Sequence, residues 1–172
     1  MVFASPMDRS YDGPVQLCKL RAGSYRPAMD LSFRPATADD YQYCAGLYFE
    51  DAAHYIHDPA ALAALRAGFP PRWHANDVRI VSRDGVDIGW LQGAVRDGAF
   101  FIIQFFIETA LRDRGIGAAV LTRVIHEAAR EGRDVTLGVV KVNRALRLYE
   151  RLGFRITHED ERKYYMRRAA SG

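Results

Sequence analysis

The sequence is poor in cysteine and has no long hydrophobic run. Its 172 residues contain two cysteines, Cys18 and Cys44, without CxxC or zinc spacing, which excludes a disulfide-built scaffold and favours free thiols in a reducing compartment. The longest apolar run, 100–107, is interrupted by Gln104 and falls short of the roughly 18 residues that a membrane-spanning helix needs. A signal-peptide layout is also missing at the start. We therefore expect a cytoplasmic protein with no membrane partner.

Lysine and excess charge of one sign are scarce too. The 24 basic residues, of which three are lysines, stand against 21 acidic ones and leave a net charge of +3. So small a surplus does not mark a nucleic-acid-binding surface, and we expect no nucleic acid as a partner. An RNA-binding role carried by the arginines between 112 and 151 is a rival reading, which predicts salt-dependent affinity.

What is present is an average globular composition, with 49% hydrophobic and 26% charged residues. This balance and the length favour one domain with its own core. Residues 1–29 are rich in Pro, Gly and Ser and predict a loosely ordered extension, and residues 30–172 carry the periodic pattern of the domain. Strands are predicted at 31–34, 78–82, 86–95, 99–107, 135–140, 154–157 and 164–167, and helices at 40–67 (broken at Asp58-Pro59), 116–129 and 143–152. Strands and helices are mixed, so we predict an α/β fold with a sheet of mixed direction.

A glycine-containing loop joins the predicted strand 99–107 to the helix at 116–129. It reads Arg-Asp-Arg-Gly-Ile-Gly-Ala over residues 112–118. Free N–H groups at a helix start, reinforced by the helix dipole and two arginines, favour a phosphate-bearing ligand. An ordinary tight turn explains the glycines equally well. Val120 stands where a dinucleotide fingerprint needs its third glycine, and no Walker lysine motif is present, so neither of those nucleotide sites is expected.

A second motif follows the strand at 135–140. Asn143 is followed by Arg-Ala, then by Leu148-Tyr149, and Gly153-Phe154 closes the segment. With the loop at 112–117, which fits R/Q-x-x-G-x-G/A, the chain resembles the GNAT superfamily of acetyl-CoA-dependent N-acetyltransferases. The resemblance implies a GNAT fold, with a mostly antiparallel mixed sheet and helices on both faces.

The resemblance also implies where acetyl-CoA, the cosubstrate, would bind. The pyrophosphate would lie on the loop amides, and the pantetheine would lie along the backbone of the fourth strand, where a bulge parts it from the fifth. Asn143 matches a CoA-contacting asparagine of the family, although a plain helix cap is an equally good role for it. The expected cofactor-binding residues are Phe106, Ile107, Arg112, Asp113, Arg114, Gly115, Ile116, Gly117, Ala118 and Asn143.

Tyr149 is the candidate catalytic residue, because the departing CoA thiolate benefits from a proton donor and the matching tyrosine often serves as one in the family. Packing of a helix-face aromatic is the alternative. Gln104 stands where family members often carry a carboxylate base. It can orient substrate but cannot accept the amine proton. We assign Gln104 and Glu50 to the acceptor side and leave the base open among Glu50, Glu108 and the first-helix groups Asp51 and His54.

The predicted activity is transfer of an acetyl group from acetyl-CoA to a primary amine by direct transfer, with a small molecule or a peptide as acceptor. The alternative is a non-catalytic acyl-CoA-binding or sensing module on the same fold. No metal is expected, because His54 and His57 lack further ligands. A homodimer, common in the family, is left open.

Overall fold

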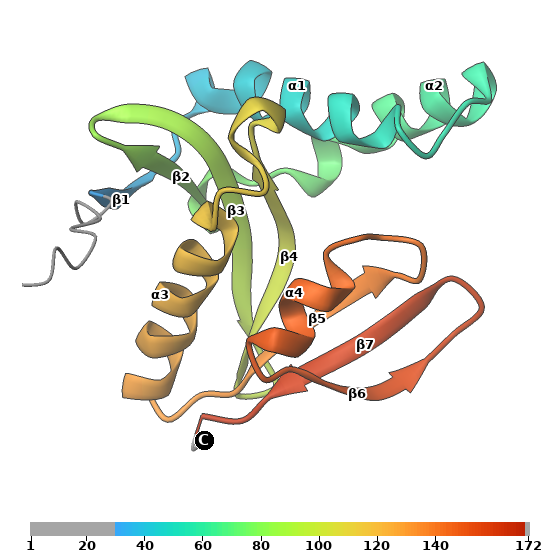
Figure 1. The fold of residues 1–172 in the computed structure, drawn as a ribbon. Helices are drawn as coiled ribbons and strands as arrows, with labels where there is room; N and C mark the ends of the chain where they lie inside the picture. Colours follow the sequence, from blue (N-terminus) through green and yellow to red (C-terminus); the bar gives the residue numbers. More distant parts are fainter. Residues whose placement is uncertain (1–29, 171–172) are drawn as a thin grey trace, which may run out of the picture.

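Within residues 30–170, the part of the chain that the computed structural model describes, one sheet of seven strands runs in the order β1-β2-β3-β4-β5-β7-β6 (Figure 1). The prediction for residues 1–29 lies outside this range. The strands are β1 (Leu31–Pro35), β2 (Val78–Arg83), β3 (Val86–Arg96), β4 (Ala99–Ile107), β5 (Val135–Val140), β6 (Arg155–Glu159) and β7 (Lys163–Arg168). The helices are α1 (Tyr41–Ala52), α2 (Pro59–Gly68), α3 (Ile116–Arg130) and α4 (Leu146–Arg151).

The sheet is antiparallel except at its centre. Among the described strands, β4 and β5 form the one parallel pair, and α3 supplies the crossover between them, as a parallel connection requires. The remaining neighbours pair antiparallel, including the β2–β3 and β3–β4 hairpins. The mixed α/β sheet predicted from the sequence is therefore confirmed.

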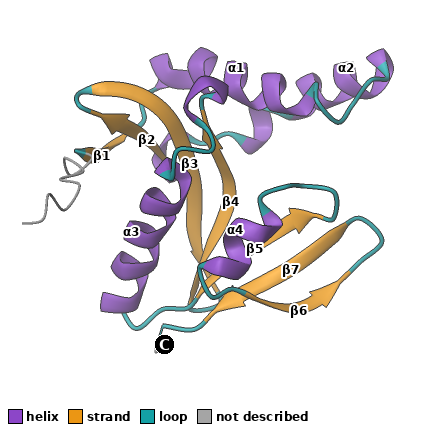
Figure 2. Ribbon diagram, viewed as in Figure 1, coloured by secondary structure: helices purple, strands orange, loops and turns teal. Residues whose placement is uncertain are grey.

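Helices cover both faces of this sheet (Figure 2). On one face, α1 packs on Ile80 and Trp90 through an aromatic-rich cluster that includes Phe69. On the other face, α3 and α4 share a core with Leu91, and Tyr149 and Phe154 belong to that core. The alternation of Trp90 and Leu91 between the two clusters follows from the period-two geometry of a strand. Each face of the central strands is thus buried under helix.

Two predicted element boundaries are informative. The break at Asp58-Pro59 is confirmed, because the Asp58 carboxylate accepts hydrogen bonds from the first amides of α2 and Pro59 occupies its first position. The last helix, predicted from residue 143, begins instead at Leu146. Asn143 and its neighbours form a turn, in which the Asn143 side chain accepts a hydrogen bond from the Ala145 amide at 2.8 Å.

Candidate functional site

The central strands β4 and β5 part soon after they meet. Their register runs from Phe100 opposite Val135 to Ile102 opposite Leu137 and ends there. At the same level the β3–β4 register slips, so that Ile103 is an extra residue in β4. A bulge of this kind bends the strand and interrupts pairing. The backbone from residue 104 to Ile107 thus runs without β5 as a neighbour, although β3 still pairs with its other edge.

The loop after β4 leads into α3 through two residues with positive φ. Asp113 has φ 61° and Gly115 has φ 80°, and only glycine adopts this conformation without strain. Gly115 is the N-cap, and as a glycine it offers no side chain to cap the helix. The first in-helix bond of α3 runs from the Ala119 amide to the Gly115 carbonyl. The preceding first-turn amides point to the positive end of a helix that begins at Ile116, an arrangement suited to an anion.

Arg112 is engaged within the protein. Its backbone amide donates to the Thr109 carbonyl at 3.2 Å. Its Nε donates to the Ile107 carbonyl at 2.9 Å, and Nη1 forms an ion pair with Oδ1 of Asp51 at 2.8 Å. The side chain of Arg112 therefore holds the loop against β4 and α1. Arg114, by contrast, lies exposed.

Tyr149 lies on α4, beside the parting of the two strands. Its side chain is 9% exposed and packs against Phe154 with ring centroids 5.8 Å apart. Burial, with the nearby Asp51 carboxylate as the second cause, raises the pKa of Tyr149 to about 12. The phenol is therefore protonated at neutral pH and can donate a proton. Helix-face packing, the alternative role, is also present.

Gln104 lies on the α1 side of β4. It pairs with Gln92 of β3, two positions from the Trp90–Phe106 pair, and directly paired residues point to the same face. Phe106 packs in the aromatic cluster under α1. Gln104, which the sequence assigned to the acceptor side, thus shares with Phe106 the face that α1 covers.

Two other carboxylates of this region have protein partners. Oε1 of Glu50 accepts a hydrogen bond from the Thr109 hydroxyl at 2.6 Å. Oε1 of Glu108 accepts one from the Tyr43 hydroxyl at 3.2 Å. Burial, followed by the charge of Glu108, raises the pKa of the Tyr43 hydroxyl above its usual range. Both carboxylates thus brace the segment after β4.

Gly89 of β3 is a site residue that the sequence reasoning missed. It pairs with Ile107, and a Cβ on Gly89 would stand 2.3 Å from the carbonyl oxygen of Phe106. Glycine here lets β3 approach the part of β4 that has no β5 partner. A glycine inside an apolar strand pattern is the signal that could have found it.

Two further observations concern the described range alone. Among residues 30–170, no three His, Cys, Asp or Glu side chains are grouped so as to hold a metal ion. None of the helices in that range is both long and apolar enough to cross a membrane.

A family model described as "Acetyltransferase (GNAT) domain" matches residues 74–156, which include β4, the loop at 112–118, Asn143 and Tyr149. No curated protein sequence matches the chain. Residues 74–156 thus match a GNAT acetyltransferase domain, and the fold is that of GNAT structures.

Solved structures share this fold at low identity. The PaiA N-acetyltransferase of Thermoplasma acidophilum, in complex with coenzyme A, superposes with a TM-score of 0.70 at 14% identity over 82% of this chain and 99% of its own. The ribosomal-protein-S18-alanine N-acetyltransferase of Escherichia coli has a TM-score of 0.61 at 18% identity over 83% and 95%. Arabidopsis thaliana Naa50, in complex with the bisubstrate analogue CoA-Ac-MVNAL, gives 0.56 at 16% over 81% and 98%. These likenesses establish the fold.

Proposed function

We propose that this protein is an N-acetyltransferase that moves the acetyl group of acetyl-CoA to a primary amine by direct transfer. One observation carries the proposal. The N-terminus of α3, which has no side-chain cap, comes shortly after the part of β4 that does not pair with β5. A buried, protonated Tyr149 lies close to the point where β4 and β5 separate. An anion cradle, a free strand edge and a proton donor are the three parts that transfer from a phosphate-bearing thioester needs.

The cofactor-binding residues have distinct tasks. The amides of Ile116, Gly117 and Ala118 at the α3 N-terminus would receive the pyrophosphate, with Asp113 and Gly115 shaping the loop and Arg114 adding exposed positive charge. Arg112 would act by holding this loop in place, through the bonds that its Nε and Nη1 donate to Ile107 and Asp51.

The remaining contacts lie along the two strands that part. The backbone of Phe106 and Ile107 would face the pantetheine, and an amide there would polarise the thioester carbonyl. The side-chain oxygen of Asn143 accepts a hydrogen bond from the Ala145 amide. The side-chain N–H groups of Asn143 would therefore be left to contact CoA. Asn143 can therefore serve both as a turn cap and as a contact.

In the reaction, the acceptor nitrogen attacks the thioester carbonyl, the C–N bond forms and the C–S bond breaks. Tyr149 would give its phenolic proton to the departing sulfur, because its raised pKa keeps that proton in place. The proton lost by the amine would pass to a carboxylate or to water, since the Gln104 amide cannot take it. Gln104 and Glu50 would instead orient the acceptor.

Cys44 supports direct transfer over a covalent acetyl-enzyme. It is fully buried in α1, and burial raises the pKa of its thiol to about 11. A thiol in that state is neither accessible nor ionised, and so it is a poor nucleophile.

For the acceptor we propose a small amine or a peptide amine. Two structural relatives, the S18-alanine N-acetyltransferase and the Naa50 complex with a CoA-peptide analogue, support a peptide acceptor. Gln104 favours a second candidate function. With no carboxylate at the position where the family often has its base, the chain would bind acyl-CoA as a non-catalytic sensing module.

Calorimetric titration with acetyl-CoA, beside CoA and ATP, tests the shared part of both functions. Binding of both CoA species without ATP is the expected result, and no binding overturns the proposal. A thiol-release assay with an amine and peptide library then separates the two. Thiol release that depends on an amine supports the enzyme, and binding without release against the whole library supports the sensing module.

A further inference from the structure

Side chains of α1 are bonded to the segment that joins β4 to the phosphate-binding loop. Three such contacts bridge 59 to 65 residues of sequence: Tyr43 to Glu108, Glu50 to Thr109, and Asp51 to Arg112. The first helix covers the acceptor side of the sheet, and the bonded segment leads into α3. The acceptor side under α1 and the cofactor side at the start of α3 are therefore linked by these three contacts.

The pair of Asp51 and Arg112 differs from the other two contacts because it reaches a third group. From one guanidinium, Nη1 binds Asp51 at 2.8 Å and Nε binds the carbonyl of Ile107 at 2.9 Å. The side chain of Arg112 is 32% exposed and that of Asp51 is 22% exposed, so the pair is partly shielded from water. Arg112 thus ties the end of α1 to the end of β4 at the first residue of the loop.

This placement has a consequence for ligand binding. A loop that contains the strained Asp113 needs support to keep its amides directed at an anion. Ordering such a loop only on binding would cost affinity, whereas a loop held in advance does not. The carboxylate also lies near enough to Tyr149 to act on its hydroxyl through space.

We propose that Asp51 is a positioning residue for the cofactor, which acts through Arg112 by holding the phosphate-binding loop to β4 and α1. The inference rests on the proposed function, because it concerns the same acetyl-CoA site. It assigns Asp51 no proton transfer, in contrast to the base role left open by the sequence. The affinity for acetyl-CoA then depends on α1, through Asp51.

The test is a double-mutant cycle with Asp51→Asn, Arg112→Gln and the double variant. Calorimetry with acetyl-CoA gives the Kd of each, and thiol release with the best amine found gives KM and kcat. We expect each single variant to raise Kd and the KM for acetyl-CoA by about tenfold, and the double variant by about the same factor, because the two residues act as one unit. The kcat at saturating acetyl-CoA should change less than about twofold.

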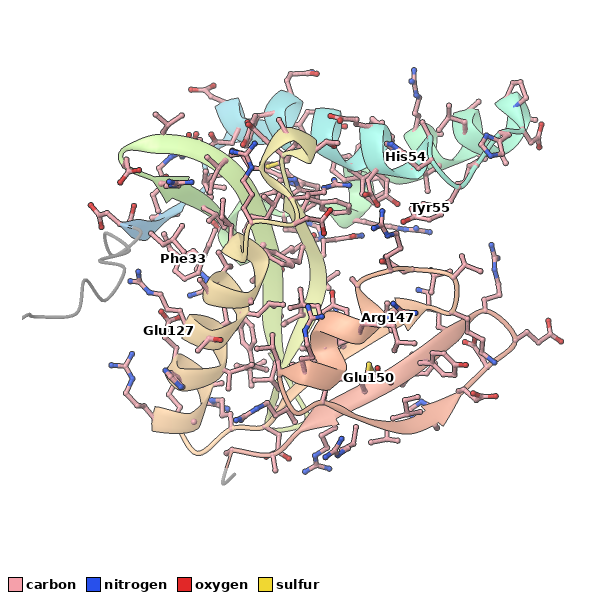
Figure 3. All side chains as sticks on the ribbon, in the orientation of Figure 1. Phe33, His54, Tyr55, Glu127, Arg147 and Glu150 are labelled. Carbon is pink, nitrogen blue, oxygen red and sulfur yellow. The ribbon has the colours of Figure 1, made fainter. Side chains whose placement is uncertain are left out.

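Glu127→Gln is the matched control. It removes the ion pair of Glu127 with Arg79, whose exposure is similar (26% for Glu127 and 31% for Arg79), together with the pair to Arg123. Glu127 lies on α3 away from the loop (Figure 3), and the Kd of this variant should equal that of the wild type. Circular dichroism and the melting temperature establish that each variant is folded. If Asp51→Asn fails to fold, Asp51→Glu and Arg112→Gln carry the test, with Asp51→Glu expected to keep Kd within about threefold.

Three results would overturn the inference while leaving the proposed function intact: unchanged Kd in Asp51→Asn, additive losses in the double variant, or a lowered kcat with unchanged KM and a shifted acid limb of the pH profile. The last would make Asp51 the base. A wild-type protein that does not bind acetyl-CoA would instead overturn the proposed function, and this inference with it.

Discussion

The α-carbon of Gly89 lies against the carbonyl of Phe106, so closely that a Cβ would come within 2.3 Å of the oxygen and 2.8 Å of the Ile107 side chain. Backbone atoms cannot move aside as a flexible side chain can. The close approach fixes β4 on β3 at the level where β5 has already left it. The position of the free β4 edge therefore depends on the absence of a side chain at Gly89 in the neighbouring strand β3.

Gly89→Ala should displace β4 and destabilise the protein by about 1–3 kcal/mol, the usual cost of overpacking. Because the displaced backbone is the expected pantetheine contact, acetyl-CoA affinity should fall in the protein that remains folded. Chemical denaturation and calorimetry measure the two effects. Gly46→Ala, on α1, is the control, since its Cβ would meet nothing within 4 Å. If Gly89→Ala is as stable as the wild type and binds acetyl-CoA equally well, the contact between the strands is not restrictive.

Tyr149→Phe should lower kcat by about 100-fold, the smaller end of what a positioned proton donor contributes. The Kd of acetyl-CoA should stay constant, because the ring and its packing on Phe154 are kept. With a folded pKa of about 12, Tyr149 stays protonated through pH 10, so the wild-type kcat should show no alkaline decline due to this group. Steady-state kinetics from pH 6 to 10 provides the measurement. An intact kcat in the phenylalanine variant would leave Tyr149 with a packing role.

Ala118→Glu should abolish acetyl-CoA binding without unfolding the protein. The third residue of α3 receives a carboxylate next to the amides expected to hold the pyrophosphate, and like charges repel. An acidic residue in the first turn is at the same time favourable for the helix dipole. Ala118→Gln has nearly the same size without charge and should retain most of the affinity. Equal affinities in the two variants would place the phosphates away from this helix start.

The ion pairs of Arg34 predict how the stability of the folded protein depends on pH. Arg34 binds Asp40 at 2.7 Å and Asp87 at 2.6 Å. Its hydrogen bond is the main cause that lowers the pKa of Asp40 to about 2, from a usual value of 3.8, and it lowers the pKa of Asp87 as well. A carboxyl group with a lowered folded pKa stabilises the native state above its unfolded pKa, and this contribution is lost as the pH falls through the folded value.

Asp40→Asn should therefore melt below the wild type at pH 7, by a difference worth about 1 kcal/mol. That difference should shrink between pH 4 and pH 2, where the wild type itself loses the ion pair. Thermal melts of both proteins at closely spaced pH values measure it. A difference that stays constant down to pH 2 would show that the charge of Asp40 contributes nothing to stability.

The sequence predicts the elements well where the pattern is local. The helix at 116–129, the neighbouring strands at 78–82 and 86–95, and the break at Asp58-Pro59 are each encoded within a few residues. The same holds for the loop at 112–118, whose glycine at positive φ is required by the backbone itself. The start of α4 was predicted three residues early, because Asn143 caps a turn with the same hydrogen bond that would cap a helix.

Contacts between distant residues were not predictable in this way. The pairing of Asp51 with Arg112 spans 61 residues, and no spacing rule relates the two. Which of the candidate carboxylates would face Tyr149 was equally hidden, since each is a charged residue near a helix end. The bulge at Ile103 and the close approach at Gly89 depend on strand register, which the sequence encodes only through packing.

The seam between β4 and β5 consists of three residue pairs. It divides the sheet into two parts, β1–β4 and β5–β7–β6, that share few backbone hydrogen bonds. We expect local unfolding to begin at this seam, with one part of the sheet unfolding before the other. A ligand bound between β4 and β5, where the two strands do not pair, would contact both strands and stabilise both parts of the sheet. Backbone amides that flank the seam should then exchange hydrogen fastest in the free protein and gain the most protection when acetyl-CoA binds.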